Sequence, residues 1–123
     1  MMLKAGISAS LAIMAATSSA AAECRYMSLR FHVAQNDSAS TTGVSRNGSA
    51  CTTRFWTSGT SHFTSGSIIA RPKHGTLSGI GSLRFRYKPQ AGFKGADQYT
   101  LRVCGTSRAG SGCSTLTYNI TVQ

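Results

Sequence analysis

Three runs near the end of the chain decide its fold, and each alternates apolar with polar residues: Leu83-Arg84-Phe85-Arg86-Tyr87-Lys88, Gln98-Tyr99-Thr100-Leu101-Arg102-Val103 and Thr115-Leu116-Thr117-Tyr118-Asn119-Ile120-Thr121-Val122. A period of two residues places every second side chain on the same face of an extended strand, so each run predicts a half-buried β-strand. The 3.6-residue period of a helix occurs nowhere in the sequence. We therefore expect an all-β domain built as a sandwich of two packed sheets, with about seven antiparallel strands.

Weaker strand signals come earlier in the chain. Residues 28–33 alternate apolar with polar side chains, an order that would turn Leu29, Phe31 and Val33 toward the core. Two further short strands are expected from runs of β-forming residues at 51–56 and 67–70.

Two polar stretches separate these strands. Residues 34–50 consist mainly of Ser, Thr, Asn and Gly, with Val44 as the one larger aliphatic residue. Because long structureless loops are unusual in compact domains, we interpret this segment as a functional, mobile loop or, alternatively, as a weak strand. Residues 57–66 are interpreted as a second polar loop, interrupted by His62 and Phe63.

The first 22 residues are interpreted as a secretory signal peptide. Lys4 supplies a positive n-region, residues 5–16 form a short apolar run, and small residues follow up to Ala22, after which we place the cut. The apolar run is too short for a stable membrane anchor, and no other segment approaches the length of a membrane span. One domain, residues 23–123, would remain, and we expect it to be secreted or periplasmic.

The four cysteines all follow the expected cut, so they would meet oxidising conditions outside the cytoplasm. Four cysteines allow three pairings. We favour Cys104–Cys113, because both residues would flank one hairpin loop rich in Gly and Ser, and this leaves Cys24–Cys51 to tie the N-terminal end to the body of the domain. A cysteine metal site is the alternative, but no Cys-x-x-Cys spacing occurs.

The chain is strongly basic. It contains 13 Lys and Arg residues against 3 acidic residues, and without Lys4 the remaining 12 basic residues give a net charge of +9. Nine of the basic residues are arginines. Such a charge favours anionic partners such as phosphorylated or carboxylated polymers, and general solubility without a dedicated ligand is the alternative.

Three motifs in the second half follow one another in a recognisable order: His74-Gly75-Thr76, Tyr87-Lys88-Pro89 and Gly92-Phe93-Lys94-Gly95-Ala96-Asp97-Gln98-Tyr99. In this order they resemble the bacterial Ig-like and cadherin-like modules that occur in tandem in secreted adhesins. The resemblance covers residues 72–123 and implies an Ig-like (cadherin-like) β-sandwich. Some of these modules carry cysteines at the positions of Cys104 and Cys113, which supports that pairing.

The last of these motifs is interpreted as a structural corner. Gly92 and Gly95 tolerate positive φ, Asp97 accepts hydrogen bonds from nearby backbone N–H groups, and Phe93 and Tyr99 would close one end of the core. A calcium site at Asp97 is the alternative, but calcium usually takes several carboxylates and the chain has three acidic residues in all.

Catalytic residues are not expected. A hydrolase needs a nucleophile, a base and an orienting acid in contact, and the sequence has no Gly-x-Ser-x-Gly elbow. His32, His62 and His74 are interpreted as surface or turn residues, and their spacing does not suit a metal site. We expect no enzyme activity, no metal and no cofactor.

The arginines are candidates for contact with an anionic partner. Arg84, Arg86 and Lys88 share the outward face of one strand, and Arg102 faces outward on the next long strand. In an Ig-like sandwich these strands lie in different sheets, so the charges would cover both faces instead of lining one nucleic-acid cleft. Trp56 is expected in the core, because tryptophan buries a large surface.

Together these features predict a small exported binding or structural module of the cell envelope. It would be non-catalytic, monomeric or weakly oligomeric, and in contact with an anionic polymer or a protein partner. A dedicated nucleic-acid site and a membrane span are not expected. The alternative is a secreted inhibitor or effector that blocks a partner enzyme through residues 34–50 or 105–112.

Overall fold

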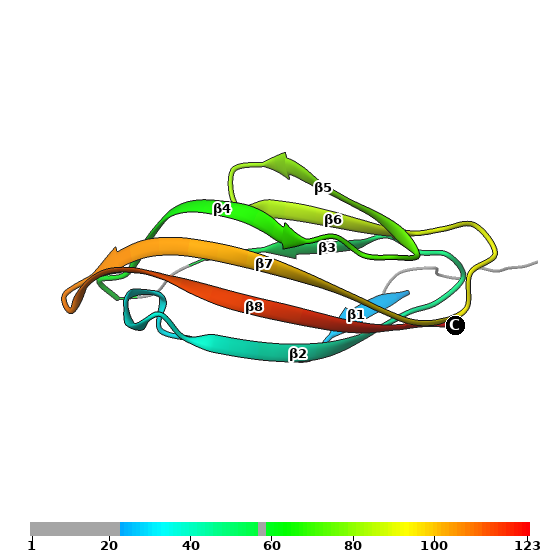
Figure 1. Cartoon of the computed structure of the whole chain (residues 1–123), viewed down its shortest axis with the longest axis horizontal. Helices are drawn as coiled ribbons and strands as arrows, with labels where there is room; N and C mark the ends of the chain where they lie inside the picture. The colour runs from blue at the N-terminus through cyan, green and yellow to red at the C-terminus, as the bar shows by residue number, and fades with distance from the viewer. Residues whose placement is uncertain (1–22, 57–58) are drawn as a thin grey trace, which may run out of the picture.

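The computed structural model describes residues 23–56 and 59–123, which form two layers of β-strands (Figure 1). One layer is a five-stranded sheet and the other a three-stranded sheet. A short 3-10 helix, η1 (Val33–Gln35), precedes the second strand. The strands are β1 (Cys24–Tyr26), β2 (Ser38–Ser45), β3 (Cys51–Arg54), β4 (His62–Ala70), β5 (Gly75–Gly81), β6 (Arg84–Pro89), β7 (Gly95–Ser107) and β8 (Gly110–Val122).

The all-β sandwich expected from the sequence is confirmed, but one pair of strands is parallel where only antiparallel strands were expected. The five-stranded sheet has the order β1-β2-β8-β7-β4 and the three-stranded sheet the order β3-β6-β5. Eight strands occur in the described residues, and β2 pairs with β8 in parallel, from Ser38 opposite Thr115 to Ser45 opposite Val122. A parallel pair needs a long connection, which the intervening strands of both sheets supply. The expected signal peptide, residues 1–22, lies outside the described residues.

The interpretation of residues 34–50 as a mobile loop was wrong and its alternative, a weak strand, is confirmed, because β2 and the end of η1 lie there. The inward positions of β2 hold Thr41, Gly43 and Ser45, which are buried but not apolar, so no hydrophobic alternation marks this strand. The hydroxyl groups of Thr41 and Ser45 each donate a hydrogen bond to a backbone carbonyl. Thr41 Oγ1 donates to the Met27 carbonyl at 2.8 Å, and Ser45 Oγ donates to the Ser49 carbonyl at 2.7 Å.

Two other expected boundaries were also wrong. Residues 28–32 are not a strand, although Val33 is buried and Leu29 and Phe31 pack against the core as expected. The strand expected at 67–70 begins earlier, because β4 pairs with β7 from His62 opposite Thr106 onward. β4 lies at the edge of its sheet and its first residues are mainly polar, so the sequence pattern did not distinguish this part of the strand from a loop.

The four tyrosines meet between the two sheets. Tyr87 of β6 stacks on Tyr99 of β7 at a centroid distance of 5.8 Å, and Tyr99 stacks on Tyr118 of β8 at 4.8 Å. Tyr26 meets Tyr118 edge to face at 5.4 Å, and the Tyr26 and Tyr99 hydroxyls are 2.9 Å apart. Stacked and edge-to-face aromatic pairs therefore join both layers. The other buried apolar residues are Val33, Cys51, Leu77, Phe85, Leu101, Val103, Leu116, Ile120 and Val122.

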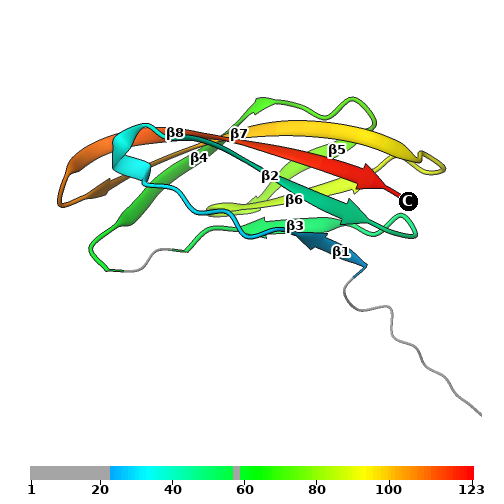
Figure 2. The ribbon, with the colours of Figure 1, turned by 90° about the horizontal axis from the view of Figure 1, so that it is seen from below.

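Two disulfides cross-link this core, and they are the pairings expected from the sequence. Cys24–Cys51 joins β1 of the five-stranded sheet to β3 of the three-stranded sheet, with a Cα–Cα distance of 5.4 Å. β1 lies beside β3 at this edge (Figure 2). Cys104–Cys113 joins residues that are directly opposite in the β7–β8 hairpin.

We expect the two disulfides to contribute unequally to stability. Replacing Cys24 and Cys51 together by Ala should lower the free energy of unfolding by about 3.5 kcal/mol, and replacing Cys104 and Cys113 by about 2.5 kcal/mol. The difference arises because the first bridge spans 27 residues and the second spans 9. Urea unfolding of the two double variants measures it. A larger loss on removing Cys104–Cys113 would contradict this order.

Candidate functional site

Asp97, at the start of β7, is a buried carboxylate surrounded by hydrogen-bond donors. It is 7% exposed. Its oxygens accept from the Lys73, His74 and Gln98 backbone N–H groups at 2.9, 3.1 and 3.0 Å. The Tyr87 hydroxyl also donates to it at 2.7 Å. The carboxylate therefore ties the segment before β5, the middle of β6 and the start of β7 to one point, and a shell of donors is the reverse of what a calcium ion needs.

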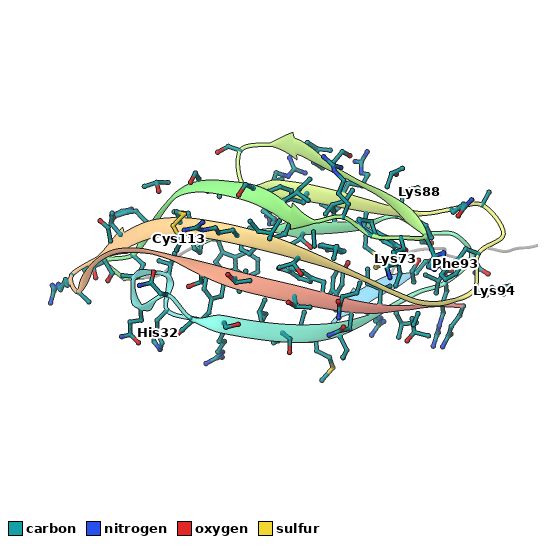
Figure 3. All side chains as sticks on the ribbon, viewed as in Figure 1. His32, Lys73, Lys88, Phe93, Lys94 and Cys113 are labelled. Carbon is teal, nitrogen blue, oxygen red and sulfur yellow. A yellow bond between two sulfur atoms is a disulfide. The ribbon has the colours of Figure 1, made fainter. Side chains whose placement is uncertain are left out.

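The rest of the expected corner lies around Asp97. Gly92 and Gly95 have φ values of +81° and +136°, where L residues are strained. Phe93 stacks on the His74 ring at 4.2 Å and covers this end of the sandwich, where Figure 3 also shows Lys73 and Lys94. Tyr99 lies deeper, inside the tyrosine core. These contacts hold the segment before β5 and the start of β7 together at this end of the sandwich.

The three histidines lie apart from one another. His32 is exposed before η1, and its backbone N–H donates to Asp37 at 2.6 Å. His62 is exposed at the start of β4, while His74 is stacked at the corner. Within residues 23–56 and 59–123, no three His, Cys, Asp or Glu side chains gather as a metal site would require. A helix able to cross a membrane is likewise not found in these residues.

The outer face of the three-stranded sheet gathers cations. Along β6 the buried Phe85 and Tyr87 alternate with exposed Arg84, Arg86 and Lys88. The strand register adds one more cation, because Arg54 of β3 is directly opposite Arg84. Hydroxyl side chains flank this line on both sides, with Thr52 and Ser78 opposite Arg86 and Thr76 opposite Lys88. We call this surface the basic face; it consists of Thr52, Arg54, Thr76, Ser78, Arg84, Arg86 and Lys88, all exposed.

The basic face has no counter-charge of its own. β3, β5 and β6 contain no acidic residue. The acidic side chains elsewhere accept hydrogen bonds from neutral donors: Glu23 from the Asn47 amide at 3.2 Å, Asp37 from a backbone N–H, and Asp97 from the groups described above. Lys88 Nζ donates to the Gly48 carbonyl. Arg54 and Arg84 therefore face each other as like charges, an arrangement that destabilises a sheet unless an anion lies between them.

The outer face of the five-stranded sheet is chemically different. Arg102 is exposed there on β7, opposite Thr115, and it is separated from the basic face by the whole sandwich. Most of its neighbours are Ser, Thr, Asn and Gln, which bond to each other, as in the 2.6 Å contact between Gln98 and Asn119. The cations named from the sequence are thus divided, with three on the basic face and one on the opposite layer.

Two site features differ from the sequence interpretation. Arg54 was not named as a candidate contact from the sequence, because its position opposite Arg84 is set by the β3–β6 register. The core position expected for Trp56 was wrong, since Trp56 is 76% exposed. Phe55 takes the inward position and packs against Phe31, Phe63 and Phe85 at centroid distances of 6.2, 5.7 and 6.4 Å, so the next residue in this extended segment lies outside.

A two-layer β-sandwich with an apolar core between its sheets, and with a disulfide that joins the two layers, is typical of the immunoglobulin-like class. The chain belongs to the bacterial Ig domain family, whose model matches residues 27–121. The match confirms the expected resemblance and extends it beyond residues 72–123. No curated protein matches the chain. Two disulfides in a bacterial Ig domain indicate an extracytoplasmic location.

The two segments named as candidate inhibitory loops contain regular secondary structure. Residues 34–50 contain η1 and β2. Residues 105–112 form the end of the β7–β8 hairpin, in which Ser107 pairs with Gly110 and only Arg108 and Ala109 form the turn. Neither segment is a long loop without secondary structure.

Proposed function

We propose that this chain is a small exported binding module of the cell envelope that is non-catalytic and contacts an anionic polymer. The observation that carries the proposal is the basic face, where β3 and β6 present four cations on a three-stranded sheet whose strands contain no acidic residue. The Ig family and the two disulfides support a rigid scaffold outside the cytoplasm. The described histidines and acidic residues lie apart or are held by structural hydrogen bonds, which supports a binding role over a catalytic one.

The composition of the basic face suits oxyanions. Three of its four cations are arginines, whose planar guanidinium groups match phosphate, sulfate and carboxylate with two parallel hydrogen bonds. A polyanion releases condensed counterions when cations bind it, so affinity of this kind falls steeply as salt is added.

Binding to an immobilised sulfated polysaccharide tests the proposal. We expect the purified protein to be retained on heparin at low ionic strength and released by salt, with a log–log slope of affinity against salt of about 3, as about four contacts to a single chain predict. Surface plasmon resonance at several salt concentrations gives this slope. A protein that fails to bind heparin or polygalacturonate even at low ionic strength would not be the module proposed here.

A further inference from the structure

The arrangement of the cations points to one particular kind of polymer. Resting on the function proposed above, we propose that the basic face binds a single extended anionic polysaccharide chain that lies along β6, with one anionic group held between Arg54 and Arg84. The ligand is recognised by its oxyanions, whether sulfate, phosphate or carboxylate, and by the hydroxyl groups of its sugars. Heparin and polygalacturonate serve as sulfated and carboxylated probes.

The cations of β6 form a line. Arg84, Arg86 and Lys88 occupy alternate positions of one strand, so their Cα atoms are about 7 Å apart in sequence order. β6 is the middle strand of its sheet, and β3 and β5 extend on either side of it. Figure 3 shows Lys88 on the side of β6 that is turned away from the five-stranded sheet. A straight row of charges on an open sheet face fits an extended chain whose anionic groups recur at a similar spacing.

The Arg54–Arg84 pair marks the strongest contact on this line. Directly opposite residues of an antiparallel pair have Cβ atoms about 5 Å apart, so two guanidinium groups can hydrogen-bond to the same oxyanion. Without a ligand the pair costs stability through repulsion between like charges. An anion bound between the two side chains removes that cost, which couples occupancy of this site to the stability of the domain.

The residues on either side of the β6 cations favour a sugar polymer over a lipid surface as the ligand. Thr52, Thr76 and Ser78 lie beside the cations, and their hydroxyl groups both donate and accept hydrogen bonds, as sugar hydroxyls require. Binding to an anionic membrane would be strengthened by exposed apolar side chains on the same face. In the described part of the chain, the large exposed apolar side chains are Met27, Trp56 and Ile69, and of these only Trp56 lies near the basic face.

The aromatic content also argues against single-stranded nucleic acid. Proteins that bind it stack successive bases on several exposed aromatic rings along a basic groove. Trp56, two residues after Arg54, is the one large aromatic side chain exposed among residues 23–56 and 59–123. One flat ring at the end of the row suits contact with a single sugar ring, and the row itself lies on a sheet face.

The test compares two double variants with equal loss of charge. Arg54→Ser with Arg84→Ser removes the opposed pair, and Arg25→Ser with Arg102→Ser removes two exposed arginines from β1 and β7 of the other sheet. We expect the first double variant to bind heparin and polygalacturonate at least about 30-fold more weakly, with a salt slope lower by about 1.5, and the second to lose about 3-fold or less. Equal losses in both variants would overturn the site while leaving binding by the protein itself intact.

A stability measurement excludes loss of folding as the cause. Arg54→Ser alone should melt at the same temperature as the parent protein or higher without ligand, because the repulsion is relieved, and yet should bind heparin more weakly. A lower melting temperature would contradict the role given to the pair. Binding to single-stranded DNA and to vesicles of anionic phospholipid should also be measured. If the protein binds one of these probes more tightly than it binds heparin and polygalacturonate, the assignment of the partner is overturned. Absence of binding to every probe would instead count against the proposed function.

Discussion

Raising the pH above about 10 is expected to unfold this domain over a narrow range of pH, because its core contains four phenol groups. Burial between the sheets raises the pKa of Tyr26, Tyr87, Tyr99 and Tyr118 above the ordinary value for tyrosine. For Tyr87 the hydrogen bond to the Asp97 carboxylate raises the pKa further, and for Tyr26 the neighbouring Tyr99 does so. Ionisation of any of these phenols would place a negative charge inside the apolar core.

The direction of the effect follows from proton linkage. In the unfolded chain tyrosine loses its proton near pH 10, whereas the folded chain keeps all four phenols neutral, so the unfolded state holds fewer protons above that pH. The stabilisation from neutral buried phenols is complete below pH 10 and is lost as the pH rises further. Each tyrosine contributes a loss of about 1.4 kcal/mol per pH unit, or about 5 kcal/mol per unit for all four. A domain of ordinary stability would unfold within roughly one to three pH units.

Circular dichroism and phenolate absorbance, recorded together soon after a jump in pH, measure this transition. Both signals should change at the same pH, because the phenols ionise only when the core opens. Tyr118→Phe is the matched control, since it keeps the stacked ring and removes one titrating group, and it should reduce the slope of stability against pH by about a quarter. Phenolate formation near pH 10 with an unchanged circular dichroism spectrum would show that the tyrosines are not buried as described.

The sequence predicted the fold where side chains alternate in size and polarity. In β6, β7 and β8 most inward residues are large and apolar, such as Phe85, Leu101 and Ile120, and the residues that alternate with them are mostly polar. The period of two was therefore readable from the residues alone. β2 was missed because its inward residues are Thr41, Gly43 and Ser45, whose places in the core depend on hydrogen bonds and on close packing by neighbouring strands.

The candidate site was predictable only in part. Alternation along one strand placed Arg84, Arg86 and Lys88 on one face, but the inclusion of Arg54 depends on which strand pairs with β6 and in which register. Register between strands distant in sequence is set by the assembled core and turns, not by the local pattern. Trp56 was misplaced for a related reason, since its neighbour Phe55 takes the inward position and packs with three other phenylalanine rings.

Replacing Asp97 by Ala is expected to lower the free energy of unfolding by about 4 kcal/mol, because a buried polar donor left without a partner costs about 1–3 kcal/mol. Four donors lose their acceptor in this variant: three backbone N–H groups and the Tyr87 hydroxyl. Asp37→Ala is the matched control, since that aspartate accepts one hydrogen bond through its side chain, from the His32 N–H, and should cost about 1 kcal/mol. Urea unfolding of both variants measures the difference.

The Tyr87→Phe variant separates the contribution of the Asp97–Tyr87 hydrogen bond from that of the hydrogen bonds between Asp97 and the backbone. Because the Tyr87 hydroxyl donates to Asp97, removing either partner removes that contact, and the double variant should lose less than the sum of the two single losses. The remaining loss in Asp97→Ala belongs to three backbone N–H groups, and two of them, those of Lys73 and His74, hold their segment against β7. Equal stability of Asp97→Ala and Asp37→Ala would mean that water replaces the carboxylate at no cost. The corner would then depend on its glycines and on the stacking of Phe93 on His74, and the aspartate of this motif would have to be explained by something other than the fold.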